Sequence, residues 1–315
     1  MSQSAQQYLR QVQLVIGTPG GPAVDVSDLR VTFNVRSASV ETLKSANIRI
    51  FNLAKATASK VLNEFTYIEL HAGYPNNMGM IFRGEICQVK YGRDQNMVDT
   101  VTEILAQDAD TAYNQAVISK TLAKGWTYED QFSALMRPLN KYGVNPGFSP
   151  SRTNSPAPRG ITMYGMVRDE MRILAEDMDC DWIMEDGFLH LIPSDGYIPG
   201  NVPVINGMTG MVGIPMQTIE GIEVQCLLNP LVKAGGAVKL NNAEIAKAAN
   251  RVPTNTTNGL QPVAGLDADG FYRVACVTHT GDTRGQQFYT YIIGYSVDPN
   301  QARPMVGPSV TAVPG

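Results

Sequence analysis

Alternating apolar and polar side chains dominate the first hundred residues. Residues 29–36 place Leu, Val, Phe and Val on one side and Arg, Thr, Asn and Arg on the other, the pattern of a half-buried strand. Similar strand signals recur in residues 12–16, 47–50, 67–74, 80–91 and 97–108. Residues 57–65 break the alternation, because Val61 and Phe65 are spaced as on a helix and Thr57 can serve as N-cap. The pattern predicts strands with one short helix.

The middle of the chain has a helical period instead. Residues 125–143 begin with the capping pattern Thr127-x-x-Asp130. Apolar residues follow on one helical face: Phe132, Leu135, Met136 and Leu139. A second helical stripe consists of Val167, Met171, Leu174 and Met178. Asp186-Gly187 then reads as the turn of a short hairpin. We predict a small α/β domain over residues 108–200, inserted between two β regions.

Strand patterns return after residue 201. They cover residues 221–230, 236–240, 271–280 and 286–295. A long polar loop, 251–270, interrupts them, and residues 300–315 are predicted to form an extended arm. The fold class is therefore mainly β with an α+β insertion, with β domains at 1–107 and 201–299.

A faint internal repeat links the two β regions. The first contains "IRIFNL", "IELHAGY", "FRGEICQVKYGRD" and "VTEIL" in order, and the second contains "IEVQCLLNP", "GAVKL", "FYRVACVTHTGD" and "YTYII". Strand-rich domains also resemble one another by chance, so duplication and coincidence both stay open at this point.

Composition narrows the function classes. A chain of 315 residues with 43% hydrophobic and 17% charged residues is expected to be globular and to hold more than one domain. Its net charge of -4 gives no basic field for tight nucleic-acid binding. No apolar run reaches 18 residues and no leader pattern is present, so we expect no membrane insertion and folding in the cytoplasm.

Cysteine spacing gives no sign of a metal site or a disulfide framework. Cys87, Cys180, Cys226 and Cys276 lie far apart without a C-x-x-C pair, and we expect buried, reduced thiols. The sequence predicts no cofactor and no metal ligand.

One glycine-flanked loop could be a reaction centre. In "HTGDTRG", Asp282 and Arg284 lie close to His279, which would suit acid/base chemistry or anion binding. The same residues also suit a hairpin connection in which glycine provides the turn and the charges bridge locally. The hairpin interpretation is favoured, because the three histidines are scattered and no second base can be named.

Other candidate chemistry is weaker. The acidic run 176–186 could supply paired carboxylates, but it straddles a helix end and a strand, which is typical of a solvated face. It lacks the glycine and terminal glutamate of a calcium loop. Asn255 begins a glycosylation triplet of the kind that arises by chance. Trp126 and Trp182 are expected in the core rather than as stacking platforms. We predict no catalytic residues.

The strand "FYTYIIGY" is the predicted interface. Both of its faces are apolar, so something besides its own core must cover it, and a neighbouring subunit would do so. The candidate interface residues are Phe288, Tyr289, Tyr291, Ile293 and Tyr295.

The sequence resembles baseplate hub proteins of tailed bacteriophages, particularly those with contractile tails. The resemblance spans residues 8–298 and is carried by "IRIFNLAKATASKVLNEFTYIELHAGY", "MIFRGEI", "TGMVGIPMQTIEGIEVQCLLNPLVKAGGAVKL" and "FYRVACVTHTGDTRGQQFYT". It implies two tail-tube-like β-barrel domains flanking the small α/β domain.

The resemblance also implies a homotrimer in the virion tail. Three chains would present six similar units around a channel and adapt a sixfold tail tube to a threefold central spike. The implied partners are the tail tube protein, the central spike protein and other baseplate proteins, with DNA passing through the lumen during ejection without specific binding. Assembly would take place in the host cytoplasm.

Two other functions stay open on the sequence alone. A distal tail or tube-initiator protein would have sixfold symmetry, and native mass distinguishes it from a trimer. A cell-wall-binding or lytic tail component would need a carboxylate pair in a groove, and a zymogram tests for it.

Overall fold

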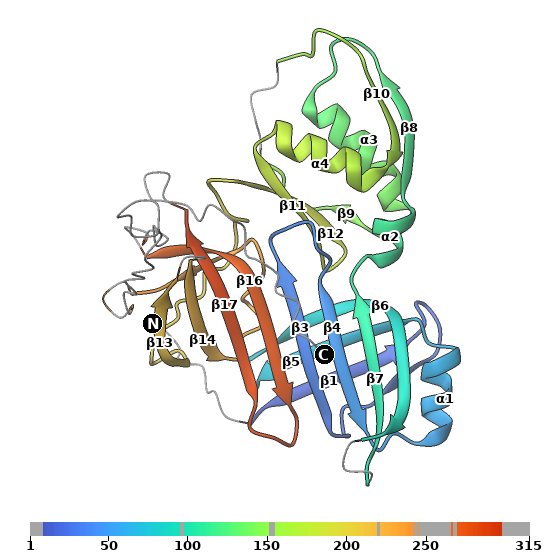
Figure 1. Cartoon of the computed structure of the whole chain (residues 1–315), viewed down its shortest axis with the longest axis vertical. Coiled ribbons are helices and arrows are strands. Elements are labelled where there is room, and N and C mark those ends of the chain that lie inside the picture. Colours follow the sequence, from blue (N-terminus) through green and yellow to red (C-terminus); the bar gives the residue numbers. More distant parts are fainter. Residues whose placement is uncertain are drawn as a thin grey trace, which may run out of the picture.

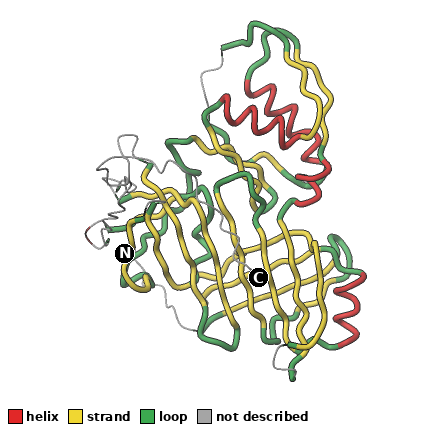
Figure 2. The backbone as a smooth tube through the Cα atoms, viewed as in Figure 1, coloured by secondary structure: helices red, strands yellow, loops and turns green. Residues whose placement is uncertain are grey.

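The computed structural model describes residues 9–94, 98–150, 155–218, 221–241, 243, 245, 266 and 270–297. The chain is mainly β, and most of its helix lies in one part at the top of the view (Figures 1 and 2). The first β region contains β1 (Gln11–Gly17), β2 (Ala23–Asp25), β3 (Val31–Ala38), β4 (Ser45–Phe51), α1 (Lys55–Asn63), β5 (Tyr67–Tyr74), β6 (Asn77–Arg93) and β7 (Thr100–Gln107).

The insertion and the second β region follow in order. The insertion contains α2 (Asp110–Gln115), β8 (Val117–Leu122), α3 (Tyr128–Asn140), β9 (Asn145–Pro146), β10 (Ile161–Met166), α4 (Val167–Asp177), β11 (Cys180–Glu185) and β12 (Phe188–Pro193). The second β region contains β13 (Met211–Gln217), β14 (Ile222–Leu227), β15 (Ala237–Lys239), β16 (Phe271–Asp282) and β17 (Phe288–Ser296).

Both β regions contribute to one twelve-stranded sheet. Its order is β13-β14-β17-β16-β3-β4-β7-β6-β5-β1-β2, and β15 also pairs with β16. The regions join where β16 runs antiparallel to β3, from Cys276 opposite Ala38 to Asp282 opposite Thr32. In the described part of the chain this path ends at β13 and β2, and no pairing closes either region into a separate barrel.

The first core lies inside the curved part of this sheet. Fully buried side chains include Leu14, Ile48, Ile68, Leu70 and Ile104. The 17-residue strand β6 pairs with β5 along its first half and with β7 along its second, so it carries the sheet around this core. Helix α1 buries two small apolar residues against it.

Helix α1 begins earlier than the sequence suggested. Its N-cap is Ala54, whose carbonyl accepts the amide of Ala58 at 2.8 Å, so Thr57 lies within the first turn and the predicted Thr57 cap is wrong. Leu53, which is 6% exposed, inserts into the first core just before the helix. The burial of Leu53 therefore fixes where the chain turns into the helix. This burial outweighs the preference of Thr57 for the N-cap position.

The insertion has its own core, with α3 and α4 packed on two small sheets (Figure 1). The capping box at α3 is confirmed, because Thr127 and Asp130 exchange side-chain and backbone hydrogen bonds. The stripe of α4 is also confirmed: Val167, Met171 and Leu174 are 0% exposed. Trp182 is buried against Tyr113, with ring centroids 6.2 Å apart, whereas Trp126 is only half-buried.

The β11–β12 hairpin turns where the sequence predicted. Asp186 and Gly187 have φ values of 54° and 79°, the left-handed pair that a two-residue hairpin turn requires. Glycine adopts this conformation without strain, and aspartate is among the residues that tolerate it best.

The faint repeat reappears in the strand order. The segment β3-β4-β7-β6-β5 of the first region has the same neighbours, in the same order, as β13-β14-β17-β16-β15 of the second. Even the irregularities agree: β6 is bulged between Ile86 and Gln88, and β16 between Val274 and Cys276. The structure thus shows two five-strand units with the same strand order at the positions of the faint repeat.

Several sequence expectations fall outside the described residues. These are the extended arm after residue 300, the Asn255 triplet and most of the polar loop 251–270.

Candidate functional site

The "GDTRG" loop is a hairpin that docks on the first β region. Asp282 at the end of β16 accepts a hydrogen bond from Arg30 at 2.8 Å and another from the Arg284 amide at 2.9 Å. Thr283 and Val31 exchange two further hydrogen bonds, each 3.0 Å long. The charged groups therefore bridge locally, as the hairpin interpretation predicted.

Arg10 holds the same hairpin from the other end of the chain. Its guanidinium donates to the carbonyls of Gly285 at 2.7 Å and Gln286 at 2.8 Å. It also stands over the Phe288 ring, 5.3 Å from the centroid. Residues nearly the whole length of the chain apart are thus fastened together at one point.

The titration behaviour of this loop fits a structural role. Burial alone would raise the pKa of Asp282, but hydrogen bonds from Arg30 and from the Arg284 amide lower it below the usual value. His279 is 4% exposed, and its Nδ1 lies 2.9 Å from Thr290 Oγ1. Burial lowers the pKa of His279 to about 3, so the imidazole is neutral at physiological pH. An ionised carboxylate and a buried histidine bonded elsewhere do not form an acid/base pair.

An ion cluster, buried except for Lys233, lies where the three parts of the molecule meet. Lys44, between β3 and β4, places its Nζ 2.9 Å from both Glu185 Oε1 and Asp186 Oδ1. Lys233, between β14 and β15, reaches the other oxygen of Asp186 at 2.6 Å. Asp108, which follows β7, accepts the Asp186 amide. We call these five residues the junction ion cluster.

The charges of the junction ion cluster are set by mutual attraction working against burial. Burial alone would lower the pKa of Lys44, but Glu185 and Asp186 raise it above the ordinary value, so the amine stays charged. Burial would raise the pKa of Asp186, but the two lysines lower it. Asp108 lacks such a close cation, and burial raises its pKa to about 7.

The acidic run 176–186 is divided between two environments. Glu176, Asp177 and Asp179 are exposed, as predicted for a solvated face. Glu185 and Asp186 are 5% and 7% exposed, so the prediction of a solvated face is wrong for this pair. Strand β11 carries them past the helix end into the junction, where Lys44, far away in sequence, neutralises them.

Another strong ion pair ties β16 to the insertion. Arg273 is 0% exposed and donates to Asp181 at 2.6 Å and to the Pro193 carbonyl at 2.9 Å. Its guanidinium also lies 5.3 Å from the Tyr295 ring centroid. The insertion is therefore fixed to the second β region through Arg273 as well as through the junction ion cluster.

Strand β17 places the candidate interface residues on two different faces. Tyr289, Tyr291, Ile293 and Tyr295 share the outward face, and Tyr291 is 43% exposed. Phe288 is 0% exposed and packs edge-on against Phe33 and Tyr74 in the first core. The outward four stay a predicted interface, whereas Phe288 is occupied within the chain.

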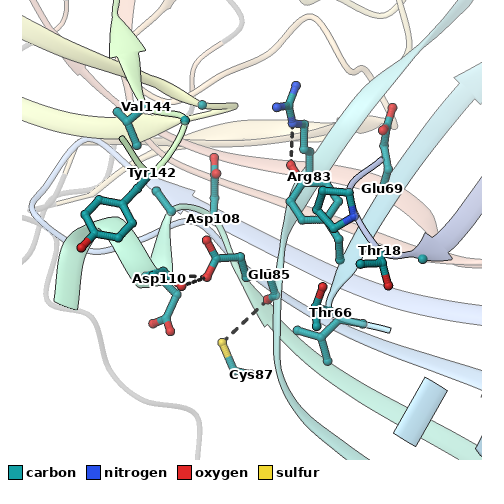
Figure 3. Close-up of a pocket in the computed structure, with 18 of the residues that line it drawn as sticks. Thr18, Thr66, Glu69, Arg83, Glu85, Cys87, Asp108, Asp110, Tyr142 and Val144 are labelled. Atoms are coloured by element: carbon teal, nitrogen blue, oxygen red, sulfur yellow. Dashed lines mark hydrogen bonds between the residues drawn. The ribbon is translucent and has the colours of Figure 1, made fainter. Parts of the chain in front are cut away.

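A pocket lies at the seam between the first β region and the insertion (Figure 3). It measures about 980 Å³, and its charged lining residues include Glu85, Asp108, Asp110 and Arg83. Glu85 accepts the Thr111 amide at 3.0 Å, and Arg83 donates to the Tyr67 hydroxyl at 2.6 Å. The Thr111 hydroxyl donates to the same carboxylate, and together these contacts position α2 and β6.

The cysteines differ from the prediction at one position. Cys180, Cys226 and Cys276 are buried, as predicted, but Cys87 is exposed, because it occupies the bulge of β6. Partial burial still raises the pKa of Cys87. Within the described residues, no three His, Cys, Asp or Glu side chains are grouped as metal ligands. None of the described helices has the length and apolar character needed to cross a membrane.

Comparison with known families shows to which family the chain belongs. A family model described as Baseplate hub gp41 matches residues 11–251, which is most of the chain. The chain belongs to the baseplate hub gp41 family. Membership of this family gives the chain a structural role in the phage tail baseplate. A comparison with curated protein sequences gives no match.

Solved structures agree with the fold. A prophage MuSo2 43 kDa tail protein from Shewanella oneidensis aligns with a TM-score of 0.59 at 8% identity, over 95% of this chain and all of its own. A tail protein from Neisseria meningitidis MC58 aligns with a TM-score of 0.57 at 10% identity, over 92% of this chain and 97% of its own.

A third solved structure comes from a secretion system. An E. coli component of the type VI secretion system, described as structurally similar to the T4 tail proteins gp27 and gp5, aligns with a TM-score of 0.53 at 12% identity. The alignment covers 96% of this chain and 80% of that protein. At such identities these likenesses show the fold alone.

Proposed function

We propose that three copies of this chain form a ring-shaped baseplate hub that joins the sixfold tail tube to the threefold central spike. The observation that carries the proposal is the repeated strand order, in which β3-β4-β7-β6-β5 and β13-β14-β17-β16-β15 form equivalent units. Two units per chain give six in a trimer. A ring of this kind presents approximate sixfold symmetry on one side while keeping true threefold symmetry for its other partner.

Each unit would be a tail-tube-like module that is completed by its neighbours. In the single chain the sheet stays open at β13 and β2. Open edges invite uncontrolled pairing, and closing a ring removes them. The barrel-like closure expected for tail-tube modules would therefore be a property of the assembly.

The ring would enclose a channel through which DNA passes during ejection. Each chain has a net charge of -4, so three copies carry -12. A surface without a basic field holds no phosphate backbone, which allows passage without specific binding. The tail tube protein, the central spike and other baseplate proteins would be the lasting partners, with assembly in the host cytoplasm.

Native mass and shape test the proposal. Light scattering on the purified chain should give three times 34.2 kDa, and negative-stain images should show a ring with a central hole. A hexamer would instead support a sixfold distal tail or tube-initiator protein. A monomer at high concentration, or clearing of peptidoglycan on a zymogram, would contradict a trimeric structural hub.

A further inference from the structure

The two five-strand units can be matched residue by residue. With the bulges aligned, Ile86 of β6 corresponds to Val274 of β16, and Gln88 corresponds to Cys276. The pairings to β7 and β17 then agree along both strands. Gly92, opposite Val101, corresponds to Thr280, opposite Tyr289. Each statement about β16 can therefore be compared with the same position of β6.

Equivalent halves of β6 and β16 have different neighbours. The C-terminal half of β16 pairs with β17 on one side and with β3 on the other. The C-terminal half of β6 pairs with β7, and no second strand borders residues 88–92 among the described residues. Val277 and His279 are 1% and 4% exposed, whereas Tyr91, which corresponds to His279, is 41% exposed. Thus β6 has an open edge where β16 has a covered one.

A second strand without a partner on one side lies at the end of the sheet in the described part of the chain. Strand β13 takes the place of β3 in the second unit, and among the described strands it pairs with β14 alone. In β3, Val31 and Phe33 are 0% and 4% exposed under the junction. In β13, Ile214 is 69% exposed and Met216 is 52% exposed. The chain thus contains one completed β16–β3 junction and the two separate halves of a second one.

Helix α1 does not rule out such a junction. In the first unit, helix α1 lies between β4 and β5, at the place where the second unit has the connection between β14 and β15. Val232 of that connection is 1% exposed and belongs to the same core as Val274 and Val277. That connection packs into the core while β16 stays free to pair with β3. Helix α1 likewise turns Ala58 and Val61 into the first core.

We propose that β13 of one copy pairs antiparallel with the C-terminal half of β6 in the next copy, repeating between chains the β16–β3 junction found within each chain. This inference rests on the proposed trimer and gives it an interface. The two halves are different surfaces, so the contact is head to tail and closes into a ring at a fixed number of copies.

The internal junction also sets the register. Thr280 lies opposite Asn34 across β16 and β3. In the first unit, Asn34 of β3 is opposite Asn47 of β4. In the second unit, Met216 of β13 is opposite Glu223, which is the residue of β14 that corresponds to Asn47. Met216 therefore corresponds to Asn34. Gly92 of one copy should therefore face Met216 of the next. The bulge between Val212 and Met216 contains Pro215, which lacks an amide donor and is tolerated on an edge strand.

A cysteine pair tests this register directly. The variant carries Gly92→Cys and Met216→Cys in a Cys87→Ser background, which removes the exposed native thiol. A Cβ at Gly92 meets nothing within 4 Å, and Met216 is half-exposed, so both changes are compatible with folding. Residues directly opposite on antiparallel strands lie close enough for a disulfide to form. Mild oxidation followed by non-reducing electrophoresis should give covalent dimers and trimers, at least tenfold above either single-cysteine variant.

The chain supplies a matched control. Asn34→Cys with Thr280→Cys places the same pair across the internal junction, and it should form an intramolecular disulfide detected by peptide mass spectrometry. Gly92→Cys with Gln217→Cys shifts the register by one residue onto the other face and should cross-link weakly.

The outcomes separate the interface from the proposed function. If light scattering gives a trimer and the control pair forms, but Gly92→Cys with Met216→Cys stays uncross-linked, the strand pairing is wrong and the trimer stands. Ladders that extend beyond three chains would support the pairing and overturn threefold closure. A protein that stays monomeric and uncross-linked would overturn both.

Discussion

The C-terminal halves of β6 and β16 are equivalent strands in different surroundings. In β16 this half reads "CVTHTGD" and has a strand on either side, whereas in β6 it reads "QVKYGRD" and has a strand on one side. The covered segment contains no lysine or arginine, whereas the open one contains Lys90 and Arg93. Charged residues on an edge strand discourage indiscriminate pairing. The comparison teaches that equivalent strands of the two units carry different side chains according to whether a second strand borders them.

The junction ion cluster holds both β regions to the insertion, so breaking it should have the largest effect. Replacing Lys44→Met leaves Glu185 and Asp186 buried near a single lysine. Removing one partner of a buried ion pair costs about 3–5 kcal/mol. Urea denaturation at fixed protein concentration measures the free energy of unfolding. Lys90→Met, at an exposed pair with Glu103, is the control and should cost less than about 0.5 kcal/mol. Equal losses in the two variants would contradict the importance of the cluster.

The next prediction contrasts equivalent positions of β17 and β7. Phe288→Ala removes a fully buried ring from between Phe33 and Tyr74, and such changes cost about 3–5 kcal/mol. Thr100 occupies the corresponding place in the first unit and is half-buried, so Thr100→Ala should cost less than about 1 kcal/mol. Thermal unfolding of both variants checks this order, and a larger loss for Thr100→Ala would break the comparison.

The third prediction is a pH dependence that arises from His279 on the covered strand. Burial lowers the pKa of His279 to about 3 in the folded protein, against 6.5 ordinarily. Between these values the unfolded chain binds a proton that the folded chain does not, so His279 destabilises the fold as the pH falls from 6.5 towards 3. Wild type should lose at most roughly 1.4 kcal/mol per pH unit more than His279→Gln over this range.

A second titrating group acts in the opposite direction and must be subtracted. The pKa of Asp108 is raised from 3.8 to about 7, so its contribution to stability falls as the pH rises between those values. It is present in both proteins and cancels in the difference between wild type and His279→Gln. Tyr91→Gln, at the equivalent open position, should leave the wild-type slope unchanged. An identical slope for wild type and His279→Gln would refute the assignment.

Periodicity predicted the elements well, because their signals are local. The stripe at Val167, Met171 and Leu174 and the turn at Asp186-Gly187 needed only neighbouring residues. Partners distant in sequence could not be foreseen in the same way. Lys44 and Glu185 are brought together by the fold, so the buried acidic pair was mistaken for part of a solvated face.

The candidate interface shows the same limit. Alternation placed Tyr289, Tyr291, Ile293 and Tyr295 on one face correctly, but nothing local indicated that Phe288 would enter the core of the other β region. The β16–β3 pairing was likewise invisible, because strand order within a sheet is decided by contacts between distant segments.

Gly281 lies directly beneath the ring of Phe33, and a Cβ there would approach the ring carbon Cζ to 2.3 Å. The ring of Phe33 can pack directly on the backbone of β16 because glycine has no side chain at this position. A shift of the β3–β16 register by one residue would place the Phe33 ring against the side chain of Thr280 or Asp282, where it would clash. The close packing of Phe33 on Gly281 therefore fixes the register of β3 against β16, so the placement of one five-strand unit beside the other is already set within the single chain.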